Sequence, residues 1–134
     1  MTDRRTVGIV LISHSRPLAE GAAELAAQVS GPDVLVVGVG GTDDGRLGTS
    51  LDALTRAVEK VAAGAGVLVI PDLGSSVLTA RSYLADSDDL PDAVRLVDTA
   101  FVEGAVAAAV AAAAGLTLDA VATAAEEARD VRKL

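Results

Sequence analysis

The segment VGIVLISHSRPLAEGAAELAAQV, residues 7–29, decides the fold class. Its first six residues are apolar and mostly β-branched, which predicts a strand at 7–12 that is buried on both faces. Ser-His-Ser-Arg-Pro then interrupts the apolar run, and apolar residues recur at helical spacing, which predicts a helix at 18–29. Pro17 suits the first turn of that helix, and Ser15 suits its N-cap. A buried strand that leads directly into a helix is the first half of a β-α-β unit.

Strands and helices are expected to alternate along the rest of the chain. The further strands are predicted at 34–39, 67–70 and 93–97, and the further helices at 51–62, about 75–84, 102–114 and 118–128. The second strand, VLVVGV, is expected to be buried, the alanine-rich fourth helix to be buried on most sides, and the charged tail to fray. This order predicts an α/β fold: a single-domain, open doubly wound sheet, mainly parallel, over residues 1–134.

Composition excludes several classes of function. A formal net charge of −8 argues against a nucleic-acid binder and against adhesion to an anionic membrane. The chain has no cysteine, which excludes disulfides and thiolate sites, and its single histidine excludes multi-histidine metal sites. The longest apolar stretch, 105–114, is too short to span a bilayer, so no membrane insertion is expected. The apolar run after the charged N-terminus is likewise too short for a signal peptide.

Three polar segments follow predicted strands directly: SHS, GGTDDGRLGTS at 40–50, and PDLGSS at 71–76. The carboxyl ends of parallel strands meet at one edge of the sheet, where ligands and chemistry gather in doubly wound folds. Topology alone therefore brings together the polar side chains of His14, Thr42, Thr49, Asp72, Ser75 and Ser76.

His14 is the candidate nucleophile of this edge. A carboxylate after another strand, Asp72, would hold one ring nitrogen and leave the other free to attack. Helix N-termini offer free N–H groups that suit a phosphate. Hydroxyl donors are available at Ser13, Ser15, Ser75 and Ser76. Two simpler interpretations stay open, namely that His14 bonds only its own loop and that Asp72 is only a turn residue or helix cap.

The loop at 40–50 matches neither a Walker motif nor a dinucleotide-binding fingerprint. Asp43 and Asp44 are adjacent acids that could ligate Mg²⁺, but such surface pairs usually do not, so no metal site is predicted. Glu103 is expected to interact with the N-terminal dipole of its helix.

Taken together, these motifs resemble the mannose-type IIA (EIIA) family of the sugar phosphotransferase system (PTS). The resemblance covers nearly the whole chain and includes SHS-x-x-LAEG, the 40–50 loop, VLVIPDLGSSVLTA and VRLVDTAFVEGAVAAAV. DLGSS together with VEGA points to the DhaM branch, which serves phosphoenolpyruvate (PEP)-dependent dihydroxyacetone kinases, rather than to the sugar-transporter domains. The second serine of DLGSS, Ser76, stands where alanine is common in the family.

The resemblance implies a phosphotransferase subunit in which His14 accepts phosphate from phospho-HPr and passes it to ADP on DhaL, while DhaK holds dihydroxyacetone. Asp72 matches the carboxylate that orients the active histidine. The residues assigned to support the phosphate are Ser13, Ser15, Thr42, Thr49, Gly74 and Ser75. The resemblance further implies a cytoplasmic homodimer that itself binds no cofactor, since ADP and Mg²⁺ belong to DhaL. Some family members carry HPr-like and enzyme I-like domains after this one, and here separate proteins are expected to supply them.

Three alternatives remain at this point. The first is an EIIA domain of a mannose-type sugar transporter, which would phosphorylate a IIB domain. The second is a regulatory module whose His14 is phosphorylated without onward transfer. The third is a small-molecule-binding α/β domain with a structural histidine.

Overall fold

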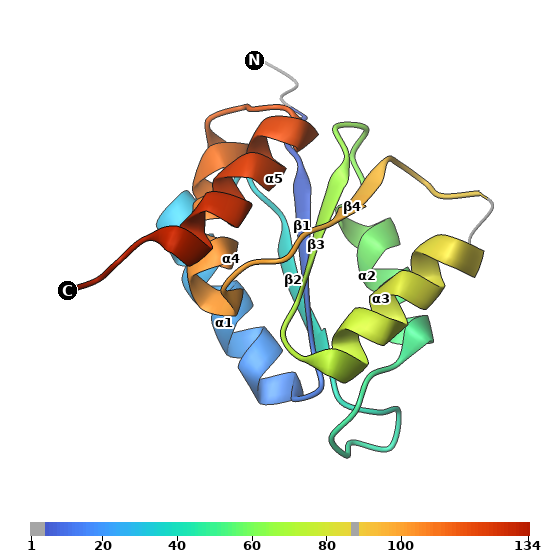
Figure 1. The fold of residues 1–134 in the computed structure, drawn as a ribbon. Helices are drawn as coiled ribbons and strands as arrows, with labels where there is room; N and C mark the ends of the chain where they lie inside the picture. The colour runs from blue at the N-terminus through green and yellow to red at the C-terminus, as the bar shows by residue number, and fades with distance from the viewer. Residues whose placement is uncertain (1–4, 87–88) are drawn as a thin grey trace.

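The computed structural model describes residues 5–86 and 89–134, in which four parallel strands form one sheet with helices on both faces (Figure 1). The elements in chain order are β1 (Gly8–Ser13), α1 (Arg16–Ser30), β2 (Val36–Gly40), α2 (Leu51–Val61), β3 (Val67–Pro71), α3 (Gly74–Asp86), β4 (Val94–Leu96), α4 (Phe101–Ala113), α5 (Leu118–Glu127) and a 3₁₀ turn, η1 (Ala128–Asp130). The predicted element order and the open, doubly wound α/β fold are confirmed.

The strand order is β2-β1-β3-β4, so β1 and β3 are central and β2 and β4 are edges. All three pairings are parallel, and Ile9 of β1 lies between Val36 of β2 and Leu68 of β3. The carboxyl ends of β1 and β3 therefore lie side by side, at the lower end of the molecule in Figure 1.

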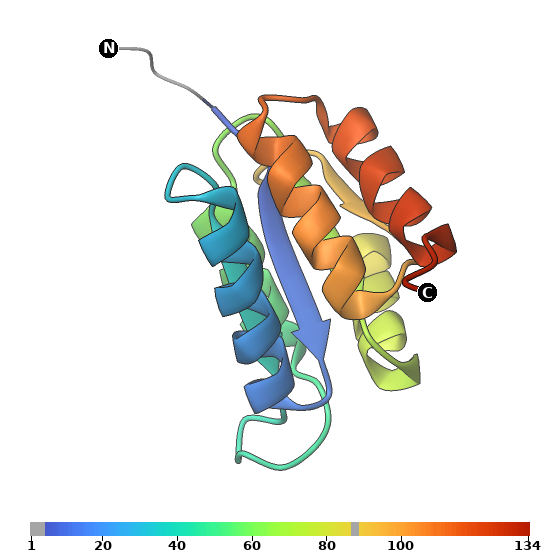
Figure 2. The ribbon, with the colours of Figure 1, turned by 90° about the vertical axis from the view of Figure 1, so that its left-hand side faces the viewer.

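Each face of the sheet has its own apolar core. Ile9, Leu11 and Ile70 pack against α1, α4 and α5, the helices that cover one face (Figure 2). Val10 and Ile12 point to the opposite face, where α2 and α3 cover the sheet. The side chains of successive strand residues alternate between the two faces, so a nearly continuous apolar strand such as β1 has to be covered on both. No helix in the described ranges combines the length and the apolar character that crossing a membrane requires.

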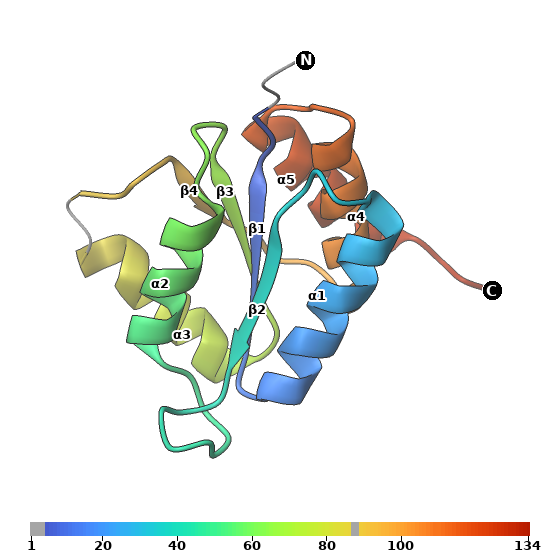
Figure 3. The same cartoon turned by 180° about the vertical axis from the view of Figure 1, so that it is seen from behind.

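The second strand corrects one prediction. It begins at Val36 rather than at residue 34, and all five of its residues are only half-buried. The reason is its position, because an edge strand has a neighbour on one side only (Figure 3). The helix α1 packs closely on β2, and Gly38 and Gly40 make this approach sterically allowed. A Cβ on Gly38 would lie 2.2 Å from the carbonyl oxygen of Ala19.

The helices differ from the predicted ranges mainly at their ends. The first begins at Arg16, two residues early, because Pro17 fits its first turn. Of the tail expected to fray, residues 129–134, the first two belong to the 3₁₀ turn over 128–130, and 131–134 are exposed and form no helix or strand. Lys133 Nζ, in this last stretch, lies 2.5 Å from a carboxylate oxygen of Glu103. Glu103 thus has a lysine partner in addition to its place in the first turn of α4.

Candidate functional site

The site lies where the two central strands end. His14 directly follows β1 and Asp72 directly follows β3, and the N–H of Asp72 donates to the carbonyl of Ile12 at 3.1 Å. The His14 side chain is 30% exposed, whereas the Asp72 side chain is only 5% exposed. The sheet thus presents an accessible imidazole beside a sheltered carboxylate.

The two nitrogens of the His14 ring have different environments. Nδ1 lies 3.2 Å from Oδ2 of Asp72. Nδ1 is buried, and its contact with the carboxylate is not aligned as a hydrogen bond; among the described residues it has no other polar partner. Nδ1 therefore does not belong to the accessible part of the ring. Nε2 is the nitrogen that is left to attack an incoming group.

The carboxylate of Asp72 is held at both oxygens. The hydroxyl of Ser13 donates to Oδ2 at 2.6 Å, while the hydroxyl of Ser76 lies 2.7 Å from Oδ1 and the N–H of Leu73 donates to Oδ1 at 2.6 Å. Desolvation by burial acts to raise the pKa of Asp72, but the hydrogen bonds from Ser13, Ser76 and Leu73 and the nearby charge of His14 outweigh it and lower the pKa. Asp72 is therefore an anion at neutral pH.

Ser76 was predicted to lie at this edge as a hydroxyl donor but was not among the residues assigned to support the phosphate. It is fully buried, and its hydroxyl oxygen accepts from the N–H groups of Asp72 at 3.0 Å and Leu73 at 3.2 Å. Its single proton faces two acceptors, Oδ1 of Asp72 and the carbonyl of Leu73, each at 2.7 Å. Ser75, which was predicted to support a phosphate, is exposed on the first turn of α3. Ser76 is thus the serine that fixes the turn carrying Asp72.

The serines that flank His14 have different roles. Ser13 is fully buried, and its hydroxyl accepts from the N–H of Ser15 at 2.9 Å while donating to Asp72. Ser15 takes the predicted N-cap position of α1, but its side chain makes no capping hydrogen bond. Ser13 therefore belongs to the carboxylate support, and the half-buried hydroxyl of Ser15 is not engaged in the cap.

The loop between β2 and α2 reaches His14 through its backbone. The N–H of Gly48 donates to the carbonyl of His14 at 2.8 Å. The hydroxyl of Thr42 contacts Asp44 and accepts from the N–H of Arg46 at 3.2 Å, so it is used within the loop. The loop thus contacts the site through its backbone, while the Thr42 hydroxyl is bonded within the loop rather than to the His14 ring.

Thr49 joins the loop to α3. Its hydroxyl is paired with the hydroxyl of Thr79 and donates to the carbonyl of Ser75 at 3.3 Å. Ser50, rather than Thr49, caps α2 by accepting from the N–H of Ala53 at 3.2 Å. Thr49 therefore connects two segments beside the site rather than touching His14 or Asp72.

Free backbone donors at the start of α3 give the site groups that could hold a phosphate. The first hydrogen bonds of α3 are donated by Ser76 and Val77 to the carbonyl of Leu73. The N–H groups of Gly74 and Ser75 precede them and have no helical acceptor, as is general for the first turn of a helix. These are the donors, together with the helix dipole, that favour an anion at a helix N-terminus.

Within the described ranges, no group of three or more His, Cys, Asp or Glu side chains is arranged to hold a metal ion. Of the two adjacent acids in the loop, Asp44 pairs with Arg46 at 2.8 Å. The groups that the described residues place at the site are the imidazole, the carboxylate and backbone donors.

Comparison with known proteins finds relatives over most of the chain. The EIIA-man family model, described as the PTS system fructose IIA component, matches residues 8–122. A relative from Listeria innocua, named PEP-dependent dihydroxyacetone kinase 2, phosphoryl donor subunit DhaM, is 34% identical over 105 residues, which are 78% of this chain and 84% of the relative. A relative from Lactococcus lactis, named PTS-dependent dihydroxyacetone kinase, phosphotransferase subunit DhaM, is 32% identical and covers 87% of this chain and 90% of its own length.

Other relatives are longer than this chain. The phosphoryl donor subunit DhaM of Escherichia coli K12 is 38% identical over 117 residues, which are 84% of this chain but 25% of that protein. Among solved structures, the crystal structure of an unknown function protein, EF1359, has a TM-score of 0.81 at 27% identity, with 96% of this chain and 97% of that chain covered.

Proposed function

We propose that this chain, which belongs to the EIIA-man family, is a phosphohistidine carrier and the phosphoryl donor subunit of a PEP-dependent dihydroxyacetone kinase. In this proposal His14 accepts phosphate from phospho-HPr and passes it to ADP bound on DhaL, which then serves the dihydroxyacetone held by DhaK. The carrier works as a cytoplasmic homodimer and needs no cofactor of its own.

One observation carries the proposal: His14 presents a partly exposed ring at the sheet edge while its Nδ1 is buried 3.2 Å from Oδ2 of Asp72. A carrier has to accept a phosphoryl group from one protein and then donate it to another. An accessible nitrogen at the rim of a sheet permits in-line approach by both, which an enclosed pocket would prevent. Phosphoryl transfer depends mainly on such positioning and on charge stabilisation.

The first transfer forms a bond between Nε2 of His14 and phosphorus while the phosphorus–nitrogen bond in phospho-HPr breaks. Before attack, Nδ1 carries the ring proton and Nε2 carries the lone pair. After attack the ring keeps that proton and gains positive charge, which the anionic carboxylate of Asp72 stabilises. A small rotation that aligns Nδ1–H with Oδ2 would complete a charge-assisted hydrogen bond.

The second transfer reverses the same bond change. A terminal phosphate oxygen of ADP attacks phosphorus, the bond to Nε2 breaks, and the ring returns to its neutral form with the proton still on Nδ1. Three oxygens of the phosphoryl group carry negative charge in both steps. The free N–H groups of Gly74 and Ser75 are the donors that this chain offers to them.

The relay is tested by incubating the protein with radiolabelled PEP, enzyme I and HPr, and then adding DhaL–ADP or, in a parallel reaction, a mannose-type IIB domain. Labelled ATP on DhaL is the expected result, and His14→Gln is the control that should transfer no label. Label that moves to a IIB domain instead would identify a sugar-transporter component. Label that stays on the chain would identify a regulatory module, and no label at all would contradict a carrier role.

A further inference from the structure

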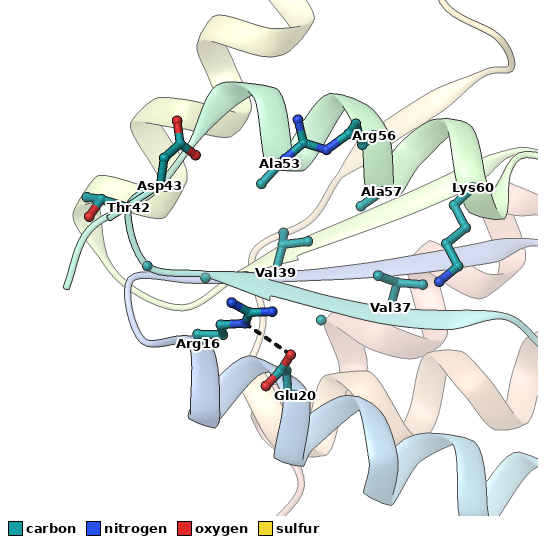
Figure 4. Close-up of a pocket in the computed structure, with 13 residues that line it drawn as sticks. Arg16, Glu20, Val37, Val39, Thr42, Asp43, Ala53, Arg56, Ala57 and Lys60 are labelled. Atoms are coloured by element: carbon teal, nitrogen blue, oxygen red, sulfur yellow. Dashed lines mark hydrogen bonds and ion pairs between the residues drawn. The ribbon is translucent and has the colours of Figure 1, made fainter. Parts of the chain in front are cut away.

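A cavity of about 340 Å³ lies along the outer edge of β2, between the first turn of α1 and the length of α2 (Figure 4). Its floor is the strand from Val37 to Gly40, and Gly41 lines it just beyond the strand. The strand is an edge, so nothing in the described chain pairs with its outer side. We call this cavity the β2 groove.

The floor of the β2 groove presents unpaired backbone groups. The N–H of Ile9 donates to the carbonyl of Leu35, and Ile9 pairs in register with Val36. In a parallel ladder alternate residues bond to the same neighbour, so Leu35, Val37 and Val39 are committed to β1. The N–H and C=O groups of Gly38, in the floor, and of Val36, just before it, consequently point to the open edge, where an added strand could bond to them.

The charged side chains that line the β2 groove are three cations, Arg16, Arg56 and Lys60, and two acids, Glu20 and Asp43, so its lining is positive on balance. Arg56 and Lys60, one turn apart on α2, line one side, and within the described ranges no carboxylate lies at ion-pair distance from either. Arg16 lines the opposite side and is paired with Glu20 at 3.2 Å. A groove with two unpaired cations is unexpected on a chain whose net charge is −8.

We propose that the β2 groove binds an extended acidic segment of a partner protein by strand addition. Backbone groups of β2 would bind the segment's main chain, and Arg56 and Lys60 would select its carboxylates. A second copy of this chain fits less well, because a symmetric contact at this edge would bring the same cations toward each other. A small anion would use the cations but leave the backbone of β2 unpaired.

The position of the β2 groove connects it to the candidate site without depending on the site's chemistry. Gly40 at the end of the floor pairs in register with Ser13, the residue before His14. A segment bound here would hold its protein beside the exposed imidazole. Binding to the groove is independent of phosphoryl transfer, so His14→Gln should bind the segment as well as the wild type does.

The test uses a fluorescent, end-blocked hexapeptide that alternates Glu and Val, with a Lys-Val peptide as control, measured by anisotropy. The Glu-Val peptide is expected to bind, and the Lys-Val peptide is not. Arg56→Glu combined with Lys60→Glu should weaken binding by about tenfold or more. Arg81→Glu combined with Arg132→Glu makes the same charge change at exposed positions outside the groove and should change affinity less than about twofold.

Backbone pairing is tested with two Glu-Val peptides that are N-methylated at odd or at even residues. An added strand uses one of its edges, so one methylated peptide should bind and the other should lose affinity. Strand addition would be overturned if the two methylated peptides bound with equal affinity. It would also be overturned if the Arg81→Glu, Arg132→Glu variant weakened binding as much as the groove variant, or if inorganic phosphate displaced the peptide. Failure of the Glu-Val peptide to bind, with a change of oligomeric state in the Arg56→Glu, Lys60→Glu variant, would assign the edge to a second copy and also overturn the proposal.

Discussion

Replacing Asp72 with asparagine removes one charge and little volume from the centre of the site. An amide nitrogen in the place of Oδ2 would face Nδ1 of His14, which lies 3.2 Å from that oxygen, and would favour the ring form with its proton on Nε2. That form has no lone pair on the accessible nitrogen. An amide nitrogen in the place of Oδ1 would instead face the N–H of Leu73, which donates to that oxygen at 2.6 Å. The first orientation therefore removes the lone pair from Nε2, and the second sets two donors against each other.

The expected loss follows from the interaction removed. The bond that Nδ1–H would complete with Oδ2 as the ring gains charge is a hydrogen bond to a charged group. Such a bond contributes about 1.5–3 kcal/mol, so its loss corresponds to phosphate acceptance about 10- to 150-fold slower. The assay is single-turnover transfer from radiolabelled phospho-HPr, quenched in base because phosphohistidine is labile in acid. Asp33→Asn, at an exposed aspartate before β2, is the control and should keep the wild-type rate. A wild-type rate in Asp72→Asn would refute the orienting role.

Three other predictions concern the support of the site and the fold. Ser76→Ala should lower the free energy of unfolding by about 1–2 kcal/mol and slow phosphate acceptance severalfold, because the Ser76 hydroxyl holds both the turn and the carboxylate. Denaturant unfolding and the transfer assay measure these two effects, and an equal effect of Ser75→Ala, at an exposed serine, would contradict the prediction. The pKa of Asp72 is lowered, so its ionised form stabilises the fold fully above its ordinary value of 3.8, and this contribution should disappear as pH falls below that value. The contribution is measured as the difference in unfolding free energy between the wild type and Asp72→Asn at a series of pH values. If that difference already shrinks above about pH 5, the lowered pKa of Asp72 is contradicted. Gly38→Ala should cost about 1–3 kcal/mol of unfolding free energy, because its Cβ would lie 2.2 Å from a backbone carbonyl oxygen of α1; unchanged urea unfolding would show that α1 can move away from β2.

The element order was predictable because each strand is a compact apolar run bounded by turn residues. The meeting of His14 and Asp72 was predictable for the same reason, since parallel strands place their carboxyl ends on one edge. The exposure of β2 was not predictable, because its apolar pattern is also that of a central strand. Only the strand order, a property of the whole fold, makes it an edge.

The missed details of the site depend on local geometry that residue types do not determine. Ser75 and Ser76 are adjacent and chemically alike, and the phase of the first turn of α3 decides which of them faces Asp72. The hydroxyls of Thr42 and Thr49 bond within the loop and to α3, because the loop conformation selects their partners. The β2 groove combines residues from α1, β2 and α2, which no single segment reveals.

The most direct measurement is the position of the phosphoryl group on the phosphorylated protein. Mass spectrometry under non-acidic conditions maps the modified residue, and phosphorus–nitrogen couplings in NMR spectra of nitrogen-labelled protein identify the ring atom. A phosphoryl group on Nε2 of His14 is the predicted result. A phosphoryl group on Nδ1, or on any residue other than His14, would contradict the proposed function.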